Sequence, residues 1–280
     1  MSQSVYKPKP NVVQALFGRT KAVIGVIHSL PLPGSPHYDG DPVERIYAYA
    51  CAEARRYAEG GVDGLIVENH GDIPFAKPDE LGPETAAVMS VMTDRVRREA
   101  KLPTGVNVLA NGVIQALATA KAAGASFVRV NQWANAYVAN EGFMEGKAGL
   151  AARYRAAIQA RDVAVFADVH VKHGAHAIVA DRSLTELTRD AQFFDADAVI
   201  VTGQRTGDSA QLDELETVKT STSLPVLVGS GVNPDNVAAI FGYADAVIVA
   251  SALKHDGGWW NEVDPDRVRG FMDVVRRARA

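Results

Sequence analysis

Residues 163–170, VAVFADVH, form a short run of β-branched and small apolar residues that ends in polar side chains. This pattern is typical of a strand buried in a parallel sheet. Seven similar runs occur along the chain, at 22–28 (AVIGVIH), 64–69 (GLIVEN), 105–109 (GVNVL), 127–131 (FVRVN), 198–202 (AVIVT), 225–230 (PVLVGS) and 246–251 (AVIVAS). The sequence therefore predicts eight strands.

Longer amphipathic segments separate these strands and begin with helix-start signals. Ser183 followed by Glu186 has the spacing of a capping box, and Asp264 precedes a proline. Eight strands that alternate with helices require parallel pairing through right-handed crossovers. We therefore expect an α/β protein with a single (β/α)8 TIM barrel over residues 21–280. Residues 1–20 are predicted to form an N-terminal extension whose first helix covers the base of the barrel.

Composition excludes several classes of protein. The chain has 280 residues, 29 Lys and Arg against 33 Asp and Glu, and one cysteine, so no internal disulfide can form. It has no basic blocks that would bind nucleic acid, and no apolar run approaches the roughly 20 residues that span a bilayer. The amino terminus lacks the apolar core of a signal peptide. We expect a cytoplasmic protein without nucleic-acid binding or membrane insertion.

The loops differ in length on the two faces of the predicted barrel. Segments that follow strands are long and rich in Gly, Pro, His and Asn, whereas segments between a helix and the next strand are brief. In a (β/α)8 barrel the strand-to-helix loops share one face, and this face holds the active site. Loop length therefore places the site at the carboxyl ends of the strands.

The strand at 163–170 carries candidates for catalysis. Strand alternation places Asp168 and His170 on its inward face, in the mouth of the barrel, and Lys172 follows in the adjoining loop. An acid, an imidazole and an ammonium can supply acid/base catalysis, an anion contact or part of a metal site. The alternative is a structural aspartate beside a hydrogen-bonded histidine.

Two other strand ends supply a carboxylate and an imidazole. Glu68 beside Asp168 would place two carboxylates across one cavity, and their repulsion would raise the pKa of one of them. Glu68 with His28 or His170 could also hold a divalent metal, although no HxH or HExxH pattern is present. The sequence leaves open whether a metal binds here, and no organic cofactor is expected. The candidate catalytic residues are Glu68, Asp168, His170, Lys172 and His28.

Neutral and cationic side chains near these strand ends could orient a substrate. Asn107 and Asn131 suit hydroxyl or carbonyl groups. Arg129 shares the inward face with Asn131 and could bind a substrate anion, or pair with a carboxylate of the barrel instead. The predicted substrate-binding residues are Asn69, Asn107, Arg129, Asn131, His173 and Arg205, the last of which lies in the glycine-flanked loop 203–208.

Glycine-rich turns after the last two strands predict a phosphate site. Glycines after the seventh strand let backbone N–H groups approach an anion, and a short helix after the eighth strand can point its amino end at the same place. A plain tight turn is the alternative. The predicted phosphate-binding residues are Gly229, Ser230, Gly231, Ala250 and Ser251.

Two further features bear on mechanism and assembly. Schiff-base barrels need a lysine inside the cavity, commonly on the sixth strand, and residues 198–202 contain none, so imine chemistry is disfavoured. Trp259 and Trp260 follow two glycines. They could cap the pocket, pack in the core or form a subunit contact in a homo-oligomer.

Several long motifs resemble those of the BtpA/SgcQ family. They are HSLPLPGSP (28–36), VENHGDIPF (67–75), ADVHVKHGAH (167–176), TGQRTGD (202–208) and VGSGVNPDN (228–236). The resemblance implies a TIM barrel related to the phosphate-binding barrels. Some members of that family are linked to photosystem I biogenesis, and SgcQ-like members are associated with sugar-utilisation genes. His70 stands where an aromatic residue is common in the family.

These observations favour an enzyme with a small phosphorylated substrate. We expect acid/base chemistry on a phosphorylated sugar or nucleoside-like metabolite, of the isomerase, lyase or hydrolase type. The alternative is a non-catalytic biogenesis or assembly factor for a membrane complex such as photosystem I, which would act through a surface of the barrel. Polar residues that converge at six strand ends favour the enzyme.

Overall fold

Eight parallel strands close into a barrel in the computed structural model, which describes residues 7–203 and 211–280. Around the barrel the strands follow the order β1-β11-β10-β9-β7-β4-β3-β2. All eight predicted strands are present and the predicted (β/α)8 barrel is confirmed, although most strands end one or two residues early. The bounds are β1 Ala22–His28, β2 Gly64–Glu68, β3 Thr104–Asn107, β4 Phe127–Val130, β7 Ala164–Asp168, β9 Ala198–Thr202, β10 Val226–Gly229 and β11 Ala246–Val249.

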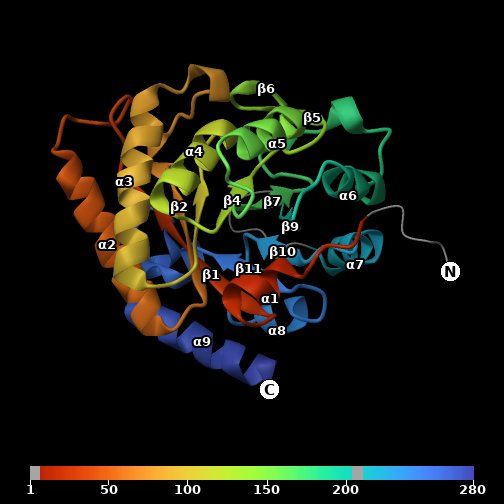
Figure 1. Cartoon of the computed structure of the whole chain (residues 1–280). Helices are drawn as coiled ribbons and strands as arrows, with labels where there is room; N and C mark the ends of the chain where they lie inside the picture. The colour runs from red at the N-terminus through yellow and green to blue at the C-terminus, as the bar shows by residue number, and fades with distance from the viewer. Residues whose placement is uncertain (1–6, 204–210) are drawn as a thin grey trace.

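Helices surround the barrel (Figure 1) and pack their apolar faces on the outward side chains of the strands. The Ser183 hydroxyl caps α6 by accepting the Glu186 N–H at 3.2 Å, and the Asp264 carboxylate caps α9 in the same way. The helix bounds are α1 Val12–Phe17, α2 Val43–Gly60, α3 Pro83–Ala100, α4 Val113–Ala123, α5 Ala148–Ala157, α6 Leu184–Phe193, α7 Leu212–Ser221, α8 Val237–Ile240 and α9 Pro265–Arg279.

Aromatic rings fill the interior of the barrel. The rings of Phe127 on β4 and Phe166 on β7 stack with centroids 4.6 Å apart. Phe17 of α1 meets Phe127 edge-on at 5.9 Å, and Val13 is buried in the same cluster. The first helix therefore packs onto the interior residues from the base of the barrel.

The Phe127 ring occupies space that a side chain at Gly105 would need. A Cβ atom at Gly105 would lie 2.2 Å from Cε2 of Phe127. We expect Gly105→Ala to lower the free energy of unfolding by about 1–3 kcal/mol, because overpacking displaces the ring. Urea unfolding measures the change. Gly270→Ala is the matched control, because a Cβ there meets nothing within 4 Å and alanine favours the helix. Equal stabilities of the two variants would contradict the packing argument.

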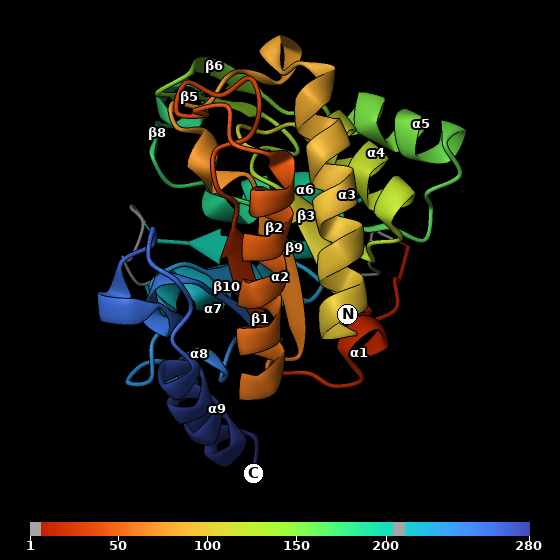
Figure 2. The ribbon, with the colours of Figure 1, turned by 90° about the vertical axis from the view of Figure 1, so that its left-hand side faces the viewer.

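A three-stranded antiparallel sheet covers part of the carboxyl-terminal face. It consists of β5 Ala136–Ala139, β6 Gly142–Glu145 and β8 Gly174–Ala175, in the order β6-β5-β8. We predicted only loops here. The sheet joins the segment after β4 to the segment after β7, and it lies at the end of the molecule opposite the C terminus (Figure 2). It therefore forms part of the wall above the barrel mouth.

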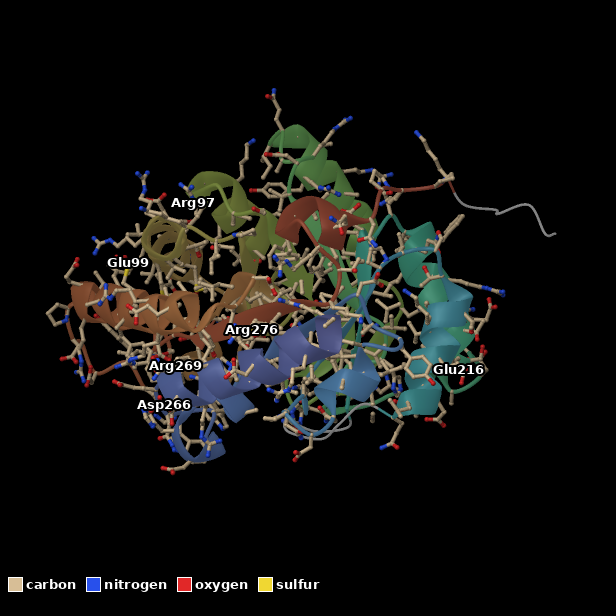
Figure 3. All side chains as sticks on the ribbon, turned by 90° about the horizontal axis from the view of Figure 1, so that it is seen from below. Arg97, Glu99, Glu216, Asp266, Arg269 and Arg276 are labelled. Carbon is tan, nitrogen blue, oxygen red and sulfur yellow. The ribbon has the colours of Figure 1, made fainter. Side chains whose placement is uncertain are left out.

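The opposite end of the molecule is covered by charged side chains. Figure 3 shows Asp266, Arg269 and Arg276 along α9, where Asp266 pairs with Arg269 and Asp273 with Arg276. Exposed pairs one helical turn apart contribute little to stability, so they do not mark a site. Among the described residues, no helix is both long and apolar enough to cross a membrane.

Candidate functional site

Two adjoining cavities open at the carboxyl ends of the strands. The larger measures about 420 Å³ and the smaller about 250 Å³. Glu68, His70, Arg129 and Lys172 line both cavities, so one bound molecule can reach from one to the other. The location agrees with the prediction from loop length.

Two buried asparagines line the larger cavity. The Asn107 side chain donates to Glu68 Oε2 at 2.7 Å, and the Asn131 side chain donates to Asp168 Oδ2 at 3.4 Å. Their Oδ1 atoms have no hydrogen-bond partner within the described residues. Both oxygens are fully buried acceptors beside the cavity, and the substrate-binding role of the two asparagines stays a prediction.

Arg129 and Asp168 form a buried ion pair beside the cavities. Arg129 Nε lies 3.1 Å from Asp168 Oδ1, and Nη2 lies 3.0 Å from Oδ2. Burial alone would lower the pKa of Arg129, but Asp168 raises it, so the guanidinium is charged. Arg129 lines both cavities, whereas Asp168 is absent from the described residues that line them. Asp168 thus holds the arginine in place, and its catalytic role stays a prediction.

Gly229 lies at the end of β10, beside Ile200 and Arg129. A Cβ atom there would lie 3.1 Å from Cγ2 of Ile200, which is a tight contact, and 3.6 Å from Nη2 of Arg129, which is an ordinary one. Gly229 was predicted to bind phosphate, but it is not among the described lining residues of either cavity.

Glu68 lies between two histidines. Its Oε1 atom is 3.7 Å from His28 Nε2 and 3.3 Å from His70 Nδ1. The two imidazole rings stack with centroids 4.5 Å apart, and the Trp259 ring packs edge-on against His70 at 4.5 Å. His28 Nδ1 lies 3.0 Å from the backbone carbonyl oxygen of Trp259. Packing and this carbonyl therefore fix the orientation of both rings.

The predicted rise in carboxylate pKa does not occur at Glu68. Burial alone would raise the pKa of Glu68, but the contacts with His70 and His28 and the positive charge of Arg129 hold it below its usual range. At Glu68 the contact with His70 is the largest of the influences that oppose the effect of burial. Burial also lowers the pKa of His28 to about 3, so its ring is neutral at pH 7.

Two predicted site residues lie away from the cavities. The Asn69 amide donates to Asp72 and to the Leu109 carbonyl, and its oxygen accepts the Leu109 N–H at 2.6 Å. It therefore fixes loops rather than substrate. Strand β7 ends at Asp168, and the His170 ring packs against that of His176 with centroids 3.9 Å apart. Neither Asn69 nor His170 belongs to the described lining.

The remaining predicted residues border the cavities. Lys172 lines both, and the exposed His173 lines the larger one. Ser230, Gly231, Ala250 and Ser251 line the smaller cavity, where a phosphate was expected. The predicted short helix after β11 is the 3-10 turn Ser251–Leu253. Arg205 lies outside the described residues.

Several lining residues were not predicted as site residues, and His70, Tyr137 and Trp259 are three of them. All three line the larger cavity. For Trp259 the sequence left three possible roles open, and capping the pocket was one of them. Strand alternation continued past Glu68 would have turned Asn69 outward and His70 inward. Tyr137 belongs to β5, and local sequence gave no indication of that strand.

A closed (β/α)8 barrel with a polar site at the carboxyl ends of its strands defines the class of this protein. Residues 19–277 match the model of the BtpA family, and the chain belongs to this family.

Its relatives share nearly the whole chain. An uncharacterized protein of Archaeoglobus fulgidus is 44% identical over 92% of this chain and 99% of its own. The photosystem I biogenesis protein BtpA of Synechocystis is 38% identical over 92% and 89%. An uncharacterized protein of Caenorhabditis elegans that is described as mitochondrial is 39% identical over 94% and 96%.

Solved structures with the same fold are more distant in sequence. Thiamine phosphate pyrophosphorylase from Pyrococcus furiosus superposes with a TM-score of 0.59 at 16% identity, over 96% of this chain and all of that one. N-(5'-phosphoribosyl)anthranilate isomerase from the same organism gives 0.53 at 17% identity, over 92% and 98%. These likenesses show the barrel fold.

Proposed function

We propose that this chain is an enzyme that uses acid/base chemistry on a small phosphorylated sugar or nucleoside-like metabolite. The observation that carries the proposal is the pair of adjoining cavities. The smaller one is lined by Arg129, Lys172 and the polar turns after β10 and β11, and suits a phosphate group. The larger one offers buried carbonyl oxygens of Asn107 and Asn131 to hydroxyl groups.

The residues shared by the two cavities supply the chemistry. Glu68 lies at the junction, with its second oxygen held by Asn107, and this position makes it the proposed base. Lys172 lies at the same junction and can donate a proton or hold the phosphate. Each of the three proposed reaction types, isomerisation, elimination and glycosidic hydrolysis, uses an acid and a base placed beside the substrate. Both structural neighbours are named after a phosphorylated compound, thiamine phosphate in one and phosphoribosylanthranilate in the other, and this supports the proposed substrate class.

The wider cellular setting is part of the proposal. A single half-buried cysteine is typical of a reducing compartment, which supports a cytoplasmic protein. Trp260, with 69% of its surface exposed, is available for a subunit contact in a homo-oligomer. The name of the Synechocystis relative favours the second candidate, an assembly factor for a membrane complex.

Inorganic phosphate should stabilise the protein against heat. A ligand at 100 times its Kd adds about 2.7 kcal/mol to the native state, so Tm rises with phosphate concentration. Ser251→Asp places a carboxylate in the smaller cavity and should abolish the rise, which differential scanning fluorimetry measures. Ser183→Asp is the control, because Ser183 is exposed and aspartate caps a helix equally well. Equal Tm rises in the two variants would remove the phosphate site from the smaller cavity.

The chemistry is tested on the same preparation. Sugar phosphates and nucleoside phosphates are incubated with the protein in D₂O, and proton NMR follows product formation and exchange of substrate C–H protons. Glu68→Gln should keep the Tm rise with phosphate and lose both reactions. Binding without any reaction across the panel, together with recovery of a membrane complex on the immobilised protein, would favour the assembly factor.

A further inference from the structure

We infer that His28, Glu68 and His70 bind a divalent transition-metal ion at the junction of the two cavities. One ligand atom from each residue lies within 4.8 Å of the other two. Ligands at about 2.0–2.2 Å from one ion are roughly 3–3.6 Å apart, which is close to the 3.3 Å and 3.7 Å separations from Glu68 Oε1. Small side-chain rotations complete the site.

The tautomer of His28 leaves a lone pair directed at the carboxylate. The Trp259 carbonyl oxygen can only accept, so His28 Nδ1, 3.0 Å away, carries the ring proton. Nε2 of the neutral ring is then unprotonated, and it faces a Glu68 oxygen that also carries lone pairs. Two acceptors that face each other in a buried site repel, whereas a cation between them binds both. A backbone carbonyl on the second ring nitrogen is the usual support of a metal-binding histidine.

His70 contributes the third ligand atom. Its Nδ1 atom is buried and faces Glu68 Oε1 at 3.3 Å. The ring is fixed by stacking on His28 and by the edge of Trp259. In the tautomer that carries its proton on Nε2, Nδ1 directs a lone pair at the same carboxylate oxygen that His28 Nε2 faces. A metal ion at the cluster binds both nitrogens and this oxygen.

Glu68 brings one negative charge to the cluster. The two cations whose charges reach the cluster have carboxylates of their own, because Arg129 forms a bidentate pair with Asp168 and Lys254 lies 3.7 Å from Glu53. Two imidazoles and one carboxylate suit zinc, iron or cobalt and leave coordination positions free.

The free positions would face the cavities. Glu68 and His70 line both of them and His28 lines the smaller one, so a bound molecule can reach the ion. An ion there would polarise an oxygen of that molecule as a Lewis acid. With an ion bound, Glu68 Oε1 is a ligand rather than a free base, so the role of base would pass to a water molecule on the ion. Metal binding is measured without substrate, so its failure is distinguishable from failure of the proposed function.

Cobalt titration tests the site. The full-length protein is dialysed against a chelator and then into buffer, and Co²⁺ is added while its visible d–d absorption and its binding heat are recorded. We expect one equivalent to bind with a spectrum distinct from that of aqueous Co²⁺. His28→Gln, His70→Gln and Glu68→Gln should each weaken binding on the order of 100-fold, because loss of an outer support alone costs 10–100-fold.

His37→Gln is the control, because His37 is an exposed histidine outside the cluster. It should bind Co²⁺ as the parent protein does. The inference is overturned if the parent protein shows no saturable binding, or if His70→Gln and Glu68→Gln bind within threefold of it. Circular dichroism melts check folding. If His28→Gln does not fold, the His70→Gln variant decides the outcome, because the His70 side chain is partly exposed and its replacement disturbs the core less.

Discussion

Replacing Asp168 by asparagine should lower the free energy of unfolding by about 3–5 kcal/mol, because the change leaves the buried Arg129 guanidinium without its bidentate partner. The Asp168 side chain is fully buried and that of Arg129 is 8% exposed, so solvent and the more distant Glu68 replace the lost partner only in part. Urea unfolding at pH 7 measures the effect. Asp273→Asn removes an exposed ion pair of α9 and should cost less than about 1 kcal/mol.

The double variant Arg129→Met with Asp168→Asn separates charge from packing. It removes both charges, so most of the lost stability should return if the uncompensated guanidinium is the cause. The single Asp168→Asn variant should also weaken phosphate binding, because Arg129 lines the smaller cavity. Unchanged stability in the single variant would show that Asp168 does not hold the arginine.

The barrel could be predicted because each of its strands shows a pattern within a few consecutive residues. A buried parallel strand is a short run rich in β-branched residues, and this run can be recognised without knowing which strands pair with it. The predicted strands 22–28 and 198–202 match the observed strands at both ends. The three-stranded sheet could not be predicted in this way. Val138 pairs with Ala175, and such pairing between distant segments leaves little trace in either segment.

The orientation of a site residue could be predicted where that residue lies within an observed strand. Alternation placed Arg129 on the inward face, where it lines both cavities, because it lies within its strand. The same alternation reaches less far at His170, because β7 ends two residues earlier and the His170 ring packs on that of His176. The pKa of Glu68 depends on a histidine and an arginine from other parts of the site, so it required the assembled structure.

A second buried pair supports the loop that carries Trp259. Glu53 of α2 and Lys254 are both fully buried, with Glu53 Oε2 and Lys254 Nζ 3.7 Å apart. Glu53 also accepts the Val263 N–H at 3.0 Å, and Lys254 donates to the Asn261 carbonyl at 3.0 Å. Burial lowers the pKa of Lys254, and Glu53 opposes that shift. The pair thus fastens the segment between β11 and α9 to α2.

We expect Glu53→Gln to lower the free energy of unfolding by about 3–5 kcal/mol, because Lys254 would keep a buried charge without a carboxylate beside it. Urea unfolding measures this loss. The double variant with Lys254→Met should recover most of it, and a double variant as unstable as the single one would contradict the electrostatic cause. The single variant should also loosen the segment whose Trp259 carbonyl orients His28. Its Co²⁺ affinity should therefore fall although no proposed ligand has changed.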